Sequence, residues 1–250
     1  MDGIKMQSVD AKVDKAAVLS SVMSCMVFIP GLTLPAGWLA LHMQIGNPFA
    51  VSAAATVSFY LLAMTCHDSI HGVAFSNGAL NRAVGEISAN LLGGSWAIFK
   101  EGHLRHHRNV GVSGEDPEQW VQNKALLVLL ARLLAVNFGY YGWCRRRGLV
   151  ALSASVQVII SLSLILIDYK AFLFGFLLPR QIACAFFAIN TSVLPHSRLA
   201  SFIEKTAPIV TGFHHTHHRA PKHPWYWYYF CSPSVTSQQG ECQGGECNEA

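Results

Sequence analysis

The sequence predicts an all-α integral membrane protein, a bundle of about four transmembrane helices with additional interfacial helices. Composition is the first reason, because the 250 residues are 52% hydrophobic and only 13% charged, against roughly 25% charged residues in soluble domains. The second reason is a series of apolar runs that are long enough, or nearly so, to cross a bilayer. The third is a set of histidine clusters beside these runs, which predicts a metal site at one membrane face.

The charge and the cysteines argue against two other classes of protein. The formal net charge is only +4 and the cations are scattered among apolar runs, so we expect no nucleic-acid partner. The seven cysteines show no CxxC spacing, which argues against a disulfide framework. We expect three segments: a polar leader at 1–15, a membrane domain at 16–230, and a tail at 231–250 whose Cys, Gly, Gln and Glu content predicts disorder.

Two apolar runs predict a first transmembrane hairpin. The first run extends from about Ala16 into Leu34 or beyond, and Pro30 and Pro35 interrupt it. The long polar leader and the second apolar run close behind favour a retained span over a cleavable signal peptide. The second run, residues 48–65, is free of charge and leads directly into the first histidine pair.

The remaining apolar runs predict interfacial helices and a second hairpin. Residues 79–99 and 125–138 are apolar but contain charged side chains, as interfacial segments do. Residues 149–167 form a charge-free run of 19 residues, which is long enough for a span. After Asp168 the chain returns through residues 171–195, which we interpret as a fourth span broken at Pro179-Arg180.

This topology predicts the orientation of the protein. With two hairpins, both termini and all the histidine clusters share one membrane face. Of the 18 Lys and Arg residues, all but Lys170 and Arg180 fall on that face. The positive-inside rule therefore predicts that the metal site and both termini are cytoplasmic.

Nine of the 12 histidines fall in three clusters. Residues four apart on a helix lie one above the other, so each cluster can present several nitrogens to one side. Eight imidazoles are too many for one tetrahedral zinc but suit two metals with several nitrogen ligands each, and iron is the natural choice. The eight predicted ligands are His67 and His71, then His103, His106 and His107, then His214, His217 and His218, whereas His215 falls outside the i, i+3, i+4 pattern.

These clusters resemble the histidine boxes of the membrane fatty acid desaturase and hydroxylase superfamily, HxxxH, HxxHH and HxxHH in this order. The resemblance covers roughly residues 67–226 and includes Glu115-Asp116-Pro117 after the second box and Pro224-Trp225-Tyr226 after the third. It implies a non-haem centre of two irons that uses O2 to remove hydrogen from an unactivated C–H bond of a long apolar lipid. It also implies a separate electron donor of the ferredoxin or cytochrome type.

A finer resemblance points to the carotenoid ketolase and hydroxylase branch of this superfamily. In that branch a Leu-Pro-His-Arg sequence precedes the last box, and here the corresponding residues are Leu194-Pro195-His196-Ser197-Arg198. Ser197 is a departure from the branch pattern. His196 leaves a span at the metal face, so we nominate it as a ninth ligand, with an interfacial histidine that binds no metal as the alternative.

Carboxylates near the boxes are candidates for orienting the imidazoles, because a ligating histidine needs an acceptor for its second nitrogen. Glu101, next to the second box, is the first candidate, and Asp68 and Asp116 are the others. Each of these residues could equally be a solvated surface acid.

The leading functional hypothesis is an acyl-lipid desaturase-type enzyme, and a carotenoid ketolase or hydroxylase is the alternative within the superfamily. A membrane metal transporter or metal-binding protein is the rival of another class, and it would place ligands in the middle of the spans. A zinc hydrolase on the same fold is a third possibility. The position oxidised depends on sub-ångström placement of a C–H bond, so the sequence does not decide the substrate or the product.

Overall fold

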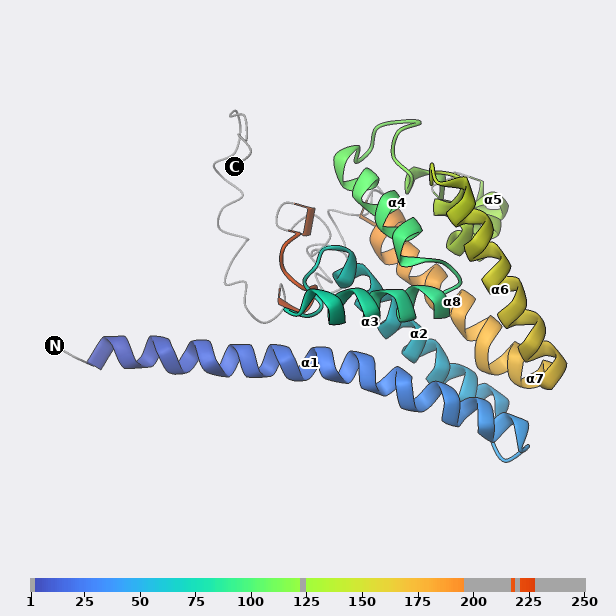
Figure 1. Cartoon of the computed structure of the whole chain (residues 1–250), viewed down its shortest axis with the longest axis horizontal. Coiled ribbons are helices and arrows are strands. Elements are labelled where there is room, and N and C mark those ends of the chain that lie inside the picture. The colour runs from blue at the N-terminus through green and yellow to red at the C-terminus, as the bar shows by residue number, and fades with distance from the viewer. Residues whose placement is uncertain (1–2, 122–124, 196–216, 219–220, 228–250) are drawn as a thin grey trace.

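The structure is a computed structural model that describes residues 3–121, 125–195, 217–218 and 221–227, with residues 3–21 as backbone only. All regular elements in this part of the chain are helices (Figure 1). Four of them are long and apolar enough to span a membrane: Val22–His42, Pro48–Ile70, Arg147–Ile167 and Tyr169–Val193. The predicted class, an all-α membrane bundle of four spans with interfacial helices and a histidine cluster, is therefore confirmed. The predicted tail at 231–250 lies outside the described residues.

Helices α1 (Gly3–His42) and α2 (Pro48–Ile70) form the first hairpin. Asn47 caps α2, because its side-chain oxygen accepts hydrogen bonds from the backbone N–H of Phe49 at 2.9 Å and of Ala50 at 3.2 Å. Our expectation that two prolines interrupt the first span was wrong, since α1 continues through both Pro30 and Pro35. Transmembrane helices tolerate proline because neighbouring groups satisfy the freed backbone carbonyls.

The second hairpin joins α6 (Arg147–Ile167) to a longer, irregular span. Asp168 caps the start of that span by accepting from Lys170 N–H at 2.9 Å and Ala171 N–H at 3.0 Å. The span consists of α7 (Tyr169–Phe172), η3 (Leu173–Leu177), α8 (Leu178–Ala188) and η4 (Ile189–Val193), in which η3 and η4 are π-helical. The predicted irregularity at Pro179 therefore takes the form of a π-turn just before it, and Pro179 occupies the first turn of α8, where its missing N–H costs least.

Interfacial helices connect the two hairpins. Helix α3 (Gly78–Leu91) and helix α4 (Trp96–Arg108) replace the single predicted run at 79–99. The break lies at Gly93, whose φ of 98° is one that side-chain-bearing residues rarely adopt. After η1 (Gln119–Val121), helix α5 (Leu126–Leu134) and η2 (Val136–Tyr141) complete the interfacial layer.

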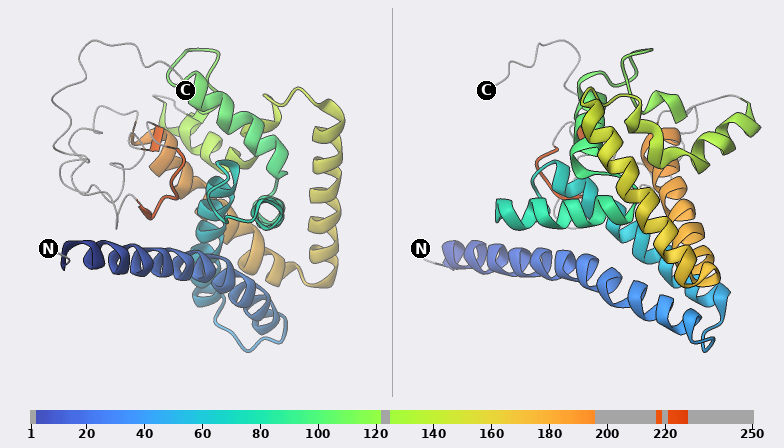
Figure 2. Two further views of the ribbon diagram at one scale, coloured as in Figure 1. Left: turned by 60° about the vertical axis from the view of Figure 1, so that its left-hand side comes forward. Right: turned by 45° about the vertical axis from the view of Figure 1, so that its right-hand side comes forward.

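Helix α2 lies at the centre of the main apolar core. Phe59, Leu62 and Cys66 of α2 pack with buried residues of α3, α4, η3 and α8. Helix α6 instead stands at the edge of the bundle (Figure 2), with most of its residues exposed. At one end of the bundle the His42 ring approaches Asp168 at 3.1 Å and joins the two hairpin turns. The opposite end of α2 carries the first histidine box.

Candidate metal centre

Helices α2 and α4 hold the first two histidine boxes. His67 lies in the last turn of α2 and His71 is its C-cap residue, and their ring centroids are 5.0 Å apart. In α4, His103 and His106 are buried on the same face as Phe99, whereas His107 is partly exposed. Phe99, His103 and His106 recur at the helical period, so the same face of α4 packs into the core and carries the predicted ligands.

The third box is described only at His217 and His218. His217 is buried and His218 partly buried. The predicted ligands His196 and His214 lie outside the described residues. The structure therefore places seven of the predicted ligands.

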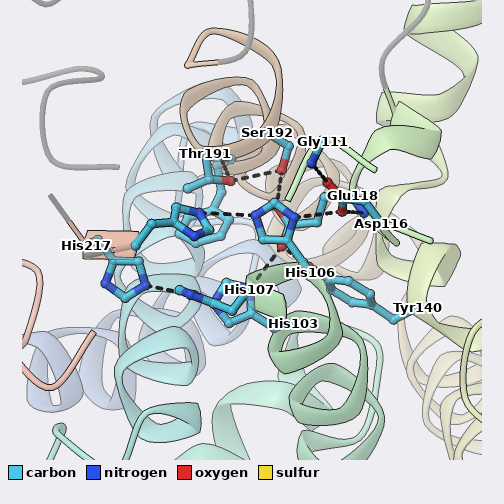
Figure 3. A network of polar contacts seen from close by, with 12 residues as sticks. His103, His106, His107, Gly111, Asp116, Glu118, Tyr140, Thr191, Ser192 and His217 are labelled. Carbon is cyan, nitrogen blue, oxygen red and sulfur yellow. Dashed lines mark hydrogen bonds and ion pairs between the residues drawn. The ribbon is translucent and has the colours of Figure 1, made fainter. Parts of the chain in front are cut away.

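These seven imidazoles converge on one place. Figure 3 shows four of them, His103, His106, His107 and His217. Nitrogens of His67, His71, His103 and His217 all lie within 4.8 Å of one another, so together they could hold a metal ion. The contacts join Nε2 atoms: His71 to His103 at 3.0 Å, His103 to His107 at 3.1 Å, His107 to His217 at 3.2 Å, and His106 to His218 at 3.2 Å.

Two carboxylates hold the outward-facing nitrogens of the second box. Nδ1 of His103 lies 2.9 Å from Glu118 Oε1, and Nδ1 of His106 lies 2.7 Å from Asp116 Oδ1. An ionised carboxylate can only accept, so the imidazole proton is on Nδ1 in both rings. Their Nε2 lone pairs then point into the cluster, where other imidazole nitrogens stand at contact distance. This donor set fits a metal cation, which can accept all these lone pairs at once.

Two of the three predicted carboxylates contact a box histidine, and the third contacts none of those that the structure describes. Asp116 contacts His106 as expected, and buried Asp68 lies 3.3 Å from His67 Nδ1. Glu101, the first candidate, is turned elsewhere: it accepts from the backbone N–H of Arg145 at 2.9 Å and contacts Cys144 and Arg146.

Sequence reasoning missed Glu118. It stands two residues after Asp116, in the same loop, and its carboxylate is buried against the second box. Considering every carboxylate of that loop, including those beyond Pro117, would have found it.

Glu118 is the most connected acceptor in this network (Figure 3). It accepts from Tyr140 Oη at 2.6 Å and from Ser192 Oγ at 2.7 Å, in addition to His103. Its second oxygen lies 3.6 Å from His106 Nε2. Glu118 therefore links the second box on α4 to η2 and to the π-turn η4 of the fourth span.

Asp68 links the first box to the segment after the third. Both of its carboxylate oxygens face the backbone N–H of Trp225, at 3.4 and 3.3 Å. Trp225 Nε1 in turn contacts Met26 Sδ at 3.2 Å, and Tyr226 packs against Met23 and Met26 of α1. The chain that follows the third box is thus fastened to the first hairpin.

Burial keeps most of the imidazoles neutral. Desolvation, followed by neighbouring imidazoles, lowers the pKa of His71 to about 2 and that of His107 to about 4. The same causes hold the pKa of His103 and His217 well below the ordinary value. Neutral imidazole is the form that binds metals, so at neutral pH no proton competes at these four rings.

His106 is the exception among these groups. Burial alone would lower its pKa, but the charge of Glu118 and the hydrogen bond and charge of Asp116 outweigh burial and raise it. For Asp116, burial opposes ionisation, yet hydrogen bonds from His106 and from the N–H groups of Gly111 and Glu118 lower its pKa. Asp116 and Glu118 therefore stabilise a positive charge at His106. A metal cation bound to this ring would supply that charge in place of a proton.

An apolar pocket opens beside the imidazole cluster. His67, His103 and Glu118 line one part of it, and residues of α2, α8 and η2 supply most of the remaining wall. Phe187 lines the pocket, whereas Phe59 is fully buried against Phe176 and Phe186 is exposed. The pocket therefore presents a mostly apolar surface directly beside the imidazoles.

Comparison with known proteins places this arrangement in a family. The family model for fatty acid desaturase matches residues 45–204. The chain belongs to the fatty acid desaturase family. It is also 27% identical to a beta-carotene ketolase of Paracoccus sp. (strain N81106 / MBIC 01143), over 76% of this chain and 86% of that protein. No solved structure matches significantly.

The family match confirms the resemblance predicted from the histidine boxes. The similarity to a beta-carotene ketolase confirms the finer resemblance to the carotenoid ketolase branch. The chain is a membrane enzyme of the desaturase and hydroxylase type, within a family of oxidoreductases. The histidine cluster agrees with the metal dependence typical of this family.

Glu118 should determine metal affinity in this desaturase-family protein. We expect Glu118→Gln to weaken Co²⁺ binding about 10- to 100-fold, because an amide cannot accept from His103, Tyr140 and Ser192 together. Titration of the purified protein with Co²⁺, followed by its visible absorption, measures this. Glu115→Gln is the matched control, since Glu115 is exposed and pairs with Arg105. Equal Co²⁺ affinity in Glu118→Gln and the native protein would disprove the role.

Gly102 should be required for the placement of Tyr140. A Cβ at Gly102 would collide with the Tyr140 ring, so Gly102→Ala should lower stability by about 1–3 kcal/mol, less what it gains in helix propensity. Gly142→Ala is the control, because its Cβ would meet only Gly139 O at 3.8 Å. Thermal unfolding in detergent distinguishes them, and a Gly102→Ala protein at least as stable as Gly142→Ala would contradict the packing argument.

Proposed function

We propose that this protein is an oxygen-dependent oxidase that uses two irons to oxidise an unactivated C–H bond of a long apolar lipid. The observation that carries the proposal is the convergence of seven imidazoles, two of which, His67 and His103, line an apolar pocket. A transporter would place ligands along the middle of its spans, whereas the described ligands lie at the end of α2, on α4, and after the fourth span.

The residues present divide into two groups that suit two metals. One is the set His67, His71, His103 and His217. The other is His106, His107 and His218, of which His106 and His218 are in contact through Nε2, and the rings of His107 and His218 are 4.3 Å apart. On sequence spacing we add His214 and His196 as ligands. Two irons bound here would activate O2 and supply the oxidant for the C–H bond.

The side chains of the protein orient these ligands and exclude water. Glu118 and Asp116 hold the Nδ1 protons of His103 and His106, so each ring presents a lone pair to the metals. Burial and the charge of Glu118 raise the pKa of Tyr140 well above its usual range, so Tyr140 remains a hydrogen-bond donor to Glu118. The apolar wall next to the histidines would hold the substrate carbon in place and keep water out.

We propose a carotenoid as the substrate class, and the relative that acts on beta-carotene supports it because the similarity extends over most of both chains. An acyl lipid is the second candidate, supported by the family to which the chain belongs. Both are long apolar molecules, and the pocket suits either class.

We further propose that the metal site and both termini face the cytoplasm, where a separate ferredoxin- or cytochrome-type protein donates electrons. The charge distribution supports this orientation. Arg108 and the run Arg145-Arg146-Arg147 are exposed, and Arg108 follows the metal-site residue His107 directly. These cations would attract an acidic partner to this face.

Expression in a host that makes β-carotene tests the function. We expect new ketone- or hydroxyl-bearing carotenoids by liquid chromatography, with fatty-acid unsaturation unchanged, and two irons per purified chain by metal analysis. His106→Ala should abolish the product. His42→Ala is the matched control, because His42 lies at the far end of the bundle beside Asp168.

Altered fatty acids without altered carotenoids would select the acyl-lipid alternative. One zinc and no iron per chain, or full product from His106→Ala, would refute a di-iron oxidase. Metal uptake into vesicles without lipid oxidation would instead favour a transporter.

A further inference from the structure

Arg180 is a buried cation near the middle of the fourth membrane-spanning segment, Tyr169–Val193. It is only 6% exposed. Within the described part of the chain, its Nε and Nη1 atoms have no hydrogen-bond partner, and the contact recorded for its head is the Phe176 ring at 4.8 Å. A cation–π contact compensates only part of the cost of desolvating a guanidinium.

A buried guanidinium with unused hydrogen-bond donors is energetically costly, so its presence requires an explanation. Ionisable side chains inside a membrane domain are rare and usually serve function, because unpaired polar groups are costly in an apolar medium. Other polar side chains near Arg180 have hydrogen-bond partners: Asn137 Nδ2 donates to Gln181 Oε1 at 2.6 Å, and Tyr141 Oη donates to Gly93 O at 3.1 Å. Arg180 thus has hydrogen-bond donors left for a ligand.

The guanidinium adjoins residues that line the pocket beside the histidines. Cys184, four residues after Arg180 and so on the same face of α8, lines that pocket, as do Leu92 and Asn137. A Cβ on Gly93 would stand 3.3 Å from Arg180 Nη1 and 3.6 Å from Asn137 Nδ2. Arg180 and Asn137 are therefore neighbours, and Gly93 leaves the space between them open.

Along the fourth span, the position of Arg180 is distant from the residues that reach the metal site. Ser192, which donates to Glu118 beside the imidazoles, belongs to the same span as Arg180. At the helical rise per residue, the two positions are about 18 Å apart along the axis. A molecule that reached from the histidines to Arg180 would extend through the whole pocket.

We propose that Arg180, together with Asn137, forms a subsite for an oxygen atom at the far end of the apolar ligand. The ligand class is a long apolar molecule with a hydroxyl, ketone or carboxylate oxygen, which accepts a hydrogen bond from the guanidinium. The proposal rests on the proposed function only in taking this pocket as the substrate's pocket. It makes Arg180 a specificity-determining residue that binds an oxygen-bearing ligand, such as a carotenoid already oxidised at its far end, more tightly than the hydrocarbon precursor.

Direct binding to the metal-free, detergent-solubilised full chain tests this subsite. The probes are parinaric acid, the corresponding alcohol and the corresponding hydrocarbon, whose polyene accepts fluorescence energy from Trp120 in the pocket wall. A Trp120→Phe variant isolates that signal. We expect the native protein to bind the alcohol or the acid at least about tenfold more tightly than the hydrocarbon. If the acid and the alcohol both bind more tightly than the hydrocarbon, the subsite accepts a neutral oxygen. If only the acid does, the subsite requires an anion.

Arg180→Met should remove the preference while retaining hydrocarbon binding, and Arg180→Lys should retain part of it. Lys170→Met is the matched control, because it removes an exposed cation from the start of the same span. Equal native affinity for all three probes would overturn the proposal, as would an undiminished preference in Arg180→Met. If Arg180→Met does not fold, the comparison of the three probes on the native protein still tests the proposal. Because no iron, O2 or turnover is involved, failure of the oxidase proposal would leave this result unaffected.

Discussion

The site depends on one pair of interactions, the hydrogen bonds from His103 to Glu118 and from His106 to Asp116. They fix the imidazole proton on Nδ1 and direct the Nε2 lone pair of each ring into the cluster. Lone pairs at contact distance repel one another unless a proton or a metal stands between them, and burial disfavours the proton at most of these rings. The carboxylates supply the negative charge that compensates a buried cation. The arrangement of lone pairs and carboxylates is therefore one that could hold a metal ion.

The bilayer explains how such distant residues meet. Each span must satisfy its backbone internally and is therefore helical, so polar ligands are confined to helix ends and connecting segments. The first hairpin places His67 at the end of α2, and the second brings Ser192 of η4 back to the same end, where it reaches Glu118. Asp68 then fastens Trp225, after the third box, to the first hairpin. The three boxes are held together by carboxylates as much as by helices.

The same network connects the pocket to the metal site. His103 and Glu118 belong to both, and Glu118 also accepts from Tyr140 and Ser192, which line the pocket. Asn137 also lines the pocket and lies next to Arg180. The π-turn η4 lies at the metal-site end of the span that carries Arg180, and π-turns often occur at functional sites. A ligand in the pocket would lie beside the residues that orient the histidines, and Arg180 adjoins the same pocket wall.

The sequence by itself determined the class of the fold, the four spans, the family and the identity of the box histidines. Apolar length and histidine spacing are local properties, so they can be read without knowing what packs against what. Only the tertiary structure decided which carboxylate serves which imidazole. Glu101 is adjacent to His103 in sequence but is directed to Arg145, while Glu118 comes from a loop that folds back over α4. The orphaned donors of Arg180 likewise depend on its long-range neighbours, because hydrogen-bond satisfaction is a property of the packed chain and not of its order.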